Sequence, residues 1–315
     1  MILVTGATGQ LGGAAIRQLL ARTEASNVAV LVRDAEKASD LAEQGVSVRV
    51  GEYGDTESLA RAVDGVERVL LVASSEFAQR AQQHQNVLEA AKTAGVELIG
   101  FTSRSLADVA GSQNAMLRDY FETEQQIRDS DVPAVIFRNA LYLDTLPFFL
   151  GGPAVFEAGI RLPTGEGRVA FALRREMGEA AANAMLDLSD GDRTYVLAAP
   201  EAYSFQDVAQ ALSEISGSTV SYESVSDDEF VAHAVTVGIP EQLARHLVSS
   251  FADVRDNQLD EASTDLQTLL GRAPASLKEG LAELFVAPVR REVQSVANRS
   301  GRGGSARSIS SSNRS

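Results

Sequence analysis

The sequence predicts an α/β protein with a doubly wound parallel sheet and a smaller, mostly helical C-terminal domain. Three observations indicate this class. Short runs of apolar, often β-branched residues recur through the first half of the chain, stretches with helical spacing separate them, and a glycine-rich segment follows the first run. Such short apolar runs are typical of strands buried on both faces of a sheet. Because strand and helix alternate, the crossovers produce parallel pairing and a Rossmann-like fold.

The individual elements follow from these patterns. Helices are predicted where apolar residues recur at intervals of three and four, over 11–22, 57–63, 79–94 and 120–130. The predicted strands cover 2–4, 28–32, 46–50, 69–72, 98–99 and 135–137.

Beyond residue 145 the rhythm changes, and Gly151-Gly152-Pro153 breaks the chain. Further strands are predicted over 169–173, 195–198 and 219–225, and helices over 228–237, 240–251 and 277–285. We therefore predict a first domain over 1–145, with added sheet and helix contributions from about 168–200. A smaller domain, mainly over 146–285, would lie on the substrate side of a cleft between the two. The segment 286–315 has six arginines, one acid and many Gly and Ser residues, and we expect it to be a disordered tail.

Composition excludes several classes of partner. The net charge of −15 disfavours nucleic acid and anionic lipid, and the absence of cysteine excludes disulfides and thiolate chemistry. No run of about 18 apolar residues is present to span a membrane, and the N-terminus does not resemble a signal peptide. We therefore expect a cytoplasmic protein. The three histidines, His84, His233 and His246, are not spaced as zinc ligands, so no metal site is expected.

The glycine-rich segment predicts a dinucleotide site. Gly6-Ala7-Thr8-Gly9-Gln10-Leu11-Gly12 lies between the first strand and the first helix, where a pyrophosphate would meet unpaired amides at the helix N-terminus. We expect Gly6 to allow the tight turn, Gly9 to let the backbone approach the pyrophosphate, and Gly12 to let helix and strand pack closely.

The end of the second strand favours NADP(H) over NAD(H). Arg33 stands there, 21 residues after Gly12, in the region where NAD enzymes usually place an acid for the ribose 2′-hydroxyl. A guanidinium can pair with a 2′-phosphate and stack on adenine. Asp34 follows directly and weakens this preference. Small residues at the end of the fourth strand, Ala73-Ser74-Ser75, would let the cofactor lie close to the sheet.

Several motifs, taken together, resemble the NmrA-like group of atypical short-chain dehydrogenases/reductases. They include T-G-A-T-G-Q-L-G at Thr5–Gly12, V-R-D-A-E-K at Val32–Lys37, Ser74-Ser75-Glu76 and Arg138-Asn139-x-x-Tyr142. Residues 1–285 are most similar to the bacterial NAD(P)H:quinone oxidoreductase type 2 subgroup. The resemblance implies two-electron hydride transfer from NADPH to quinones or related small electrophiles. It also implies that the cofactor contacts Gly6, Ala7, Thr8, Gly9, Gln10, Leu11, Arg33, Ala73, Ser74, Ser75, Asn139, Ala140, Leu141, Tyr142, Leu143 and Asp144, with Phe171 nearby.

The usual proton donor of short-chain dehydrogenases is incomplete. Tyr120 is followed four residues later by Glu124 rather than lysine, and an acid would raise the tyrosine pKa. A quinone does not need this pair, because hydride arrival yields a stabilised hydroquinone anion, and holding the two rings together suffices. Asn139 and Tyr142 are predicted to position the substrate. Together with Tyr142, the aromatic residues Phe148, Phe149 and Phe77 would shape an apolar slot, or these aromatics would serve as core of the second domain.

Alternative roles stay open for some polar residues and for the whole protein. His84 would either make a helix–helix hydrogen bond, which we favour, or face the cofactor. Thr102 and Ser103 end the fifth strand, and Ser103 would either bond to cofactor or substrate, or be structural. The competing function is an NmrA-like regulator that senses NADP(H) without turnover. The expected partner is a small quinone, and a homodimer is possible.

Overall fold

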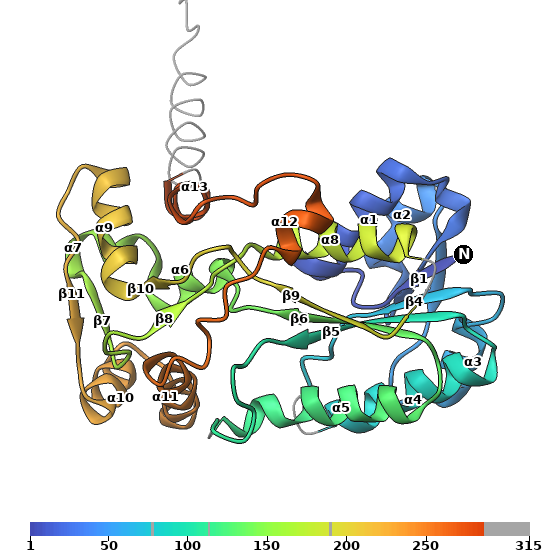
Figure 1. Cartoon of the computed structure of the whole chain (residues 1–315), viewed down its shortest axis with the longest axis horizontal. Helices are drawn as coiled ribbons and strands as arrows, with labels where there is room; N and C mark the ends of the chain where they lie inside the picture. The colour runs from blue at the N-terminus through green and yellow to red at the C-terminus, as the bar shows by residue number, and fades with distance from the viewer. Residues whose placement is uncertain (77–78, 113, 189–190, 287–315) are drawn as a thin grey trace, which may run out of the picture.

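One parallel sheet organises the protein. The computed structural model describes residues 1–76, 79–112, 114–188 and 191–286, and within them seven parallel strands follow the order β3-β2-β1-β4-β5-β6-β9 (Figure 1). Their bounds are Ile2–Val4 (β1), Val28–Val32 (β2), Ser47–Val50 (β3), Arg68–Leu71 (β4), Leu98–Arg104 (β5), Ala134–Asn139 (β6) and Arg193–Leu197 (β9). The strand order reverses between β1 and β4, which creates a crevice at the carboxyl ends of these strands. The predicted fold class is therefore confirmed.

Helices cover both faces of the sheet (Figure 1). One face carries α1 (Gln10–Arg22), α2 (Ser39–Glu43), α8 (Arg174–Asp187) and α12 (Asp265–Leu270). The other face carries α3 (Thr56–Ala62), α4 (Arg80–Thr93) and α5 (Arg118–Asp129). Each face has its own buried apolar cluster, so the strands contribute side chains to two cores, as their continuous apolar runs require.

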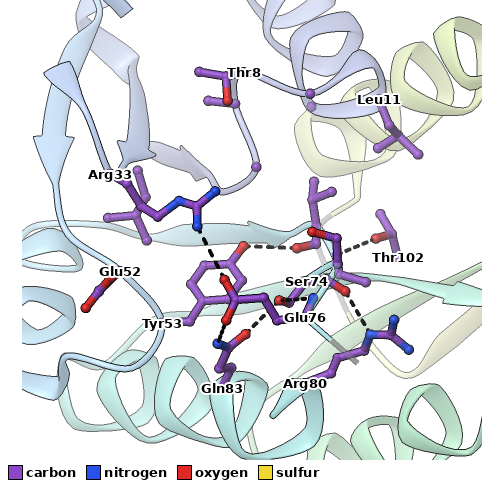
Figure 2. Close-up of a pocket in the computed structure, with 18 of the residues that line it drawn as sticks. Thr8, Leu11, Arg33, Glu52, Tyr53, Ser74, Glu76, Arg80, Gln83 and Thr102 are labelled. Atoms are coloured by element: carbon purple, nitrogen blue, oxygen red, sulfur yellow. Dashed lines mark hydrogen bonds and ion pairs between the residues drawn. The ribbon is translucent and has the colours of Figure 1, made fainter. Parts of the chain in front are cut away.

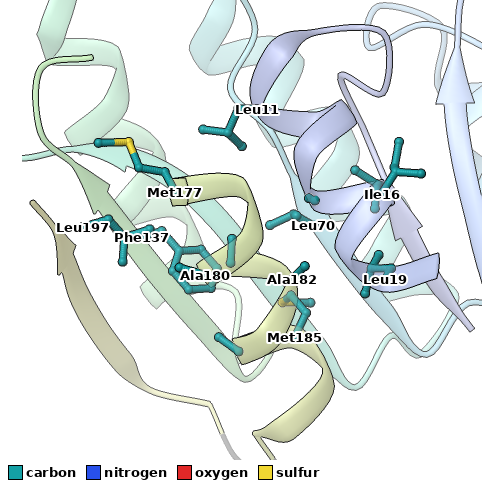
Figure 3. Close-up of a cluster of buried hydrophobic side chains, with 14 of the residues drawn as sticks. Leu11, Ile16, Leu19, Leu70, Phe137, Met177, Ala180, Ala182, Met185 and Leu197 are labelled. Carbon is teal, nitrogen blue, oxygen red and sulfur yellow. The ribbon is translucent and has the colours of Figure 1, made fainter. Parts of the chain in front are cut away.

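The contact between α1 and α8 brings a distant part of the chain against the first helix (Figure 3). Ala180, Ala182 and Met185 of α8 pack in the same cluster as Leu11 and Ile16 of α1. A Cβ at Gly178 would overlap the Leu11 carbonyl oxygen, so only glycine permits this close approach. The sequence analysis expected a helix contribution from about 168–200 but gave it no bounds, because a helix that is buried nearly all round shows little contrast between a polar and an apolar face.

The C-terminal part forms a second, smaller core. Its helices are α6 (Leu146–Phe149), α7 (Val155–Ala158), α9 (Phe205–Ser216), α10 (Asp227–Thr236), α11 (Glu241–Arg255) and α13 (Leu277–Leu281). Ser204, Ser226 and Ser276 each begin a helix with a capping box, which satisfies amides that the helix itself leaves free. Short 3-10 turns cover Ala25–Asn27, Ala35–Ala38, Ala115–Leu117, Leu143–Thr145 and Gly152–Ala154, and a π-helical turn covers Ala282–Val286.

Two predicted strands are shorter than expected and lie outside the main sheet. Of 169–173, only the start is extended: β8 (Arg168–Val169) pairs antiparallel with β10 (Tyr203–Ser204). The following residues turn toward α8, and Ala170 donates its amide to Leu259 instead of a strand partner. Of 219–225, β11 (Tyr222–Ser224) pairs in parallel with β7 (Ile160–Leu162). Val169, Phe171 and Leu173 of the first run are buried in the second core, whereas only Val220 and Val225 of the second run are buried there. Apolar spacing alone does not distinguish such core positions from a strand of the main sheet.

Within the described residues, no helix has the length and apolar composition needed to cross a bilayer. Positions 287–315 of the predicted tail lie outside the described residues.

Candidate active site

A cavity of about 750 Å³ opens at the carboxyl edge of the sheet, where the strand order reverses. Its wall is made by the glycine-rich loop, the ends of β2, β3 and β4, the start of α4, and single residues from β5, α5 and α8. This is the place where a doubly wound sheet binds its ligand, and the volume lies within the usual range for small-molecule sites.

The glycine-rich loop forms the middle of the cavity wall. Gly6 has a φ of +60°, a left-handed conformation that favours glycine, and Gly9 precedes the first turn of α1 with no side chain capping the helix. A Cβ at Gly12 would overlap the Gly6 carbonyl oxygen. The loop therefore presents backbone amides and the positive end of the α1 dipole to the cavity, a cradle that fits a diphosphate.

One end of the cavity carries an ion pair across its mouth. Arg33, after β2, lies 3.3 Å from Glu76, after β4, and both side chains are well exposed, at 74% and 51% (Figure 2). Glu76 also accepts a 2.7 Å hydrogen bond from Gln83, which in turn accepts a 2.6 Å bond from the Ser74 hydroxyl. Arg33 thus has an acidic partner that a bound 2′-phosphate would have to displace.

The other end is lined by two tyrosines with cations behind them. Tyr120 of α5 and Tyr142 after β6 line the cavity with Thr102. The buried Arg80 guanidinium lies 4.4 Å from the Tyr120 ring centre and donates to the Ser74 carbonyl. The Arg174 guanidinium lies 4.5 Å from the Tyr142 ring centre. This end combines aromatic faces, on which a flat ring can stack, with cations that favour negative charge nearby.

The acid near Tyr120 has a different role from the one predicted. Glu124 is fully buried, accepts a 2.6 Å bond from Ser103 and forms an ion pair with Arg138 at 2.7 Å. The Glu124 carboxylate is therefore paired with Arg138 and Ser103. Burial first, and then the neighbouring Tyr142, raise the pKa of Tyr120, while Arg80 opposes the shift. Our attribution of that shift to Glu124 is therefore wrong, although the direction is the one expected.

The structure brings together only some of the predicted site residues. The cavity wall includes Gly6, Ala7, Thr8, Gly9, Gln10, Leu11, Arg33, Ala73, Ser74, Ser75 and Tyr142. It does not include Asn139, Ala140, Leu141, Leu143 or Asp144. Asn139 lies buried behind Tyr142 and donates to its hydroxyl at 3.3 Å, and Asp144 accepts the Arg174 backbone amide at 2.8 Å. These residues support the wall from behind.

Of the described residues predicted to shape an aromatic slot, Tyr142 lines the cavity, whereas Phe148 and Phe149 do not. Phe148 is 57% exposed, and Phe149 packs on Phe251 with ring centres 5.4 Å apart. Phe171 is buried against Phe205 in the second core. Phe77 lies outside the described residues.

Two polar residues are structural. His84 is buried, accepts the Ser74 backbone amide at Nε2 (3.0 Å) and contacts Thr123 Oγ1 of α5 through Nδ1 (2.9 Å). Burial and then Arg80 lower its pKa to about 3, so it stays neutral. The predicted helix–helix bond is confirmed. Ser103 faces Glu124 and does not line the cavity, so the structural alternative holds for it as well.

The cavity residues that sequence reasoning missed include Arg80, Gln83, Thr102 and Arg174. Arg80 and Gln83 are three residues apart on α4 and therefore lie on the same face of that helix. Their spacing groups them, but it does not tell which face of the helix points to the cavity. Arg174 begins α8 and bonds to Gln10 at 2.8 Å, a contact that no local pattern reveals.

Comparison with known proteins identifies the family. Residues 1–283 match the model of the NmrA-like family. The chain belongs to this family. Quinone oxidoreductase 2 of Escherichia coli K12 is 37% identical to this NmrA-like chain over 286 residues, which cover 90% of the chain and 99% of the relative.

Two solved structures are similar to this NmrA-like protein over nearly their whole length. The NADPH complex of an NADPH-dependent quinone oxidoreductase from E. coli has a TM-score of 0.83 at 35% identity, covering 90% of this chain and 100% of that one. The NADP(H) complex of a triphenylmethane reductase from Citrobacter sp. has a TM-score of 0.84 at 36% identity, with the same coverages. In the part of the chain that the structure describes, no three histidine or acidic side chains are grouped to hold a metal ion.

Proposed function

We propose that this protein is an NADPH-dependent quinone oxidoreductase that transfers a hydride to quinones or related small electrophiles. The observation that carries the proposal is that one cavity joins a helix N-terminus built for a diphosphate, an arginine at one end and two tyrosines at the other. The similarity to a quinone oxidoreductase and a triphenylmethane reductase supports turnover over the alternative of a sensing regulator.

Different parts of the cavity wall would bind different parts of the cofactor. The loop from Gly6 to Leu11 would bind the diphosphate, and Arg33 would bind the 2′-phosphate. Ala73, Ser74 and Ser75 are small enough to let the cofactor cross the edge of the sheet. The nicotinamide would then reach the end of the cavity that Tyr120 and Tyr142 line.

NADPH, when bound, supplies the hydride. The protein's contribution is to hold an acceptor ring in contact range, at about 3–3.5 Å, in the correct orientation. Tyr142 would form one side of the acceptor site, and Asn139 would fix the Tyr142 hydroxyl through its hydrogen bond. Tyr120, with its raised pKa, stays protonated at neutral pH and can donate a hydrogen bond to an acceptor oxygen.

The test is NADPH oxidation, followed at 340 nm, with menadione as acceptor. We expect turnover that saturates with both substrates. An Arg245→Gln variant, purified in the same way, is the control for loss of one positive charge away from the cavity. Arg245 pairs with Glu241 on the exposed face of α11. Calorimetric NADPH binding with no oxidation above the enzyme-free rate would favour the sensing regulator.

We also propose a cytoplasmic location, since the reduced dinucleotide is kept inside the cell. A homodimer is a separate proposal. Fractionation of the source cells tests the first, and light scattering on the purified protein tests the second. A monomer mass at working concentration would exclude the dimer.

A further inference from the structure

Arg104 is a buried cation whose charge has no partner among the residues that the structure describes. It ends β5, two residues after the cavity residue Thr102, and only 9% of its surface is exposed. Arg104 is not itself part of the cavity wall; it lies next to the wall residue Tyr142. Its Nε is enclosed and has no acceptor, and the guanidinium forms no hydrogen bond or ion pair with any described residue. The guanidinium carbon lies 5.2 Å from the centre of the Tyr142 ring.

Other unpaired polar atoms surround this guanidinium. Asn139 is the register partner of Arg104 on β6, and its buried Oδ1 has no donor. Asp253 of α11 also has a buried, unpaired oxygen, Oδ2. Asp253 is close enough for Arg104 to oppose the burial that raises its pKa, yet too far for an ion pair. Three of the four buried side-chain atoms without partners, among the residues that the structure describes, therefore belong to neighbours of Arg104 or to Arg104 itself.

Such an arrangement is costly unless a ligand completes it. Burying an unpaired charge in an apolar environment is strongly unfavourable, and native proteins pair nearly all buried polar groups. Unpaired groups gathered behind one wall of a ligand cavity indicate that the missing partner comes from outside the chain.

We propose that Arg104 binds an oxygen of the hydride acceptor and stabilises the negative charge that reduction places on it, so that this site prefers quinones to cationic acceptors. The inference rests on the proposed function. With a quinone, the hydride adds two electrons and gives a hydroquinone anion, which then takes one proton from water. The guanidinium interacts more strongly with this anion than with the neutral quinone, which lowers the barrier.

A cationic triphenylmethane dye provides the contrast. The hydride neutralises its central carbon, so the product is uncharged, no proton is needed and no oxygen acquires charge. Arg104 has nothing to stabilise in that reaction and repels the dye. Loss of Arg104 should therefore separate the two acceptors, whereas general damage to the fold would lower both activities together.

The experiment compares wild type with Arg104→Ala, Arg104→Lys and the distant control Arg245→Ala, using menadione and crystal violet as acceptors. We expect Arg104→Ala to lower kcat/KM for menadione at least tenfold, to leave the NADPH dissociation constant within twofold, and not to lower kcat/KM for the dye. Added guanidinium should restore part of the menadione activity of Arg104→Ala and none in the control, and Arg104→Lys should be intermediate.

Unchanged menadione kinetics in Arg104→Ala would overturn the inference, and so would a parallel loss with both acceptors or a loss that guanidinium does not rescue. If wild type binds NADPH but reduces neither acceptor, the proposed function itself fails. If wild type reduces menadione and not the dye, the guanidinium rescue alone decides.

Discussion

The ion pair between Arg33 and Glu76 makes the cofactor preference a quantitative prediction. Arg33→Gln removes the cation proposed to bind the 2′-phosphate and leaves a side chain of similar reach. A hydrogen bond to a charged group contributes about 1.5–3 kcal/mol, and the 74% exposure of Arg33 favours the lower part of that range. Binding must also break the exposed Arg33–Glu76 pair, which offsets up to about 1 kcal/mol.

The net loss is therefore about 1–2 kcal/mol, which corresponds to an increase of roughly 5- to 30-fold in the NADPH dissociation constant. NADH has no 2′-phosphate, so its dissociation constant should change less than about twofold. Titration calorimetry with NADP⁺, NADPH, NAD⁺ and NADH on the same preparation measures both effects.

Glu76→Gln is the matched variant, and its expected effect on NADPH affinity is the opposite of that of Arg33→Gln. It removes the carboxylate that competes with the 2′-phosphate, so NADPH should bind about two- to fivefold more tightly while NADH is unaffected. Equal effects of either variant on the two cofactors, or no effect of Arg33→Gln on NADPH, would refute the assignment of Arg33 to the 2′-phosphate.

Three further predictions test the scaffold. Gly12→Val should abolish dinucleotide binding, because its side chain would overlap the Gly6 carbonyl; a binding-competent variant in calorimetry would contradict the loop assignment. Glu124→Gln should lower the free energy of unfolding by about 3–5 kcal/mol in urea titrations, because Arg138 and Ser103 lose a buried carboxylate; a change below about 1 kcal/mol would show that the ion pair is dispensable. His84 has a pKa of about 3 in the folded protein and a higher one when unfolded, so the unfolded chain takes up the proton first as pH falls. Wild type should therefore lose about 2 kcal/mol more than His84→Gln between pH 7 and pH 5, and identical slopes for the two would contradict this.

The sheet and the dinucleotide loop were predictable because their signals are local. A strand buried on both faces must be apolar along its whole length, and a loop that turns at positive φ and approaches a helix must be glycine at those positions. Gly6 and Gly12 therefore marked their place directly, and Arg33 followed from its position after the next strand.

The acceptor end was less predictable. The stretch from Asn139 to Asp144 was predicted as a block, yet only Tyr142 of those residues reaches the cavity wall. Asn139 and Asp144 point instead to partners behind it. Successive side chains point in opposite directions along a strand and at its end. A sequence motif identifies such a segment, but it does not show which of its side chains face the ligand.

The sequence by itself determined the parallel sheet, the diphosphate cradle and the arginine beside it, since each depends on residues close together in the chain. Only the tertiary structure decided what surrounds the acceptor. Arg80, Arg104 and Arg174 come from three separate elements and meet around Tyr120 and Tyr142 through packing. Whether a charged side chain is paired, buried or free for a ligand depends on such distant neighbours, and no local spacing contains that information.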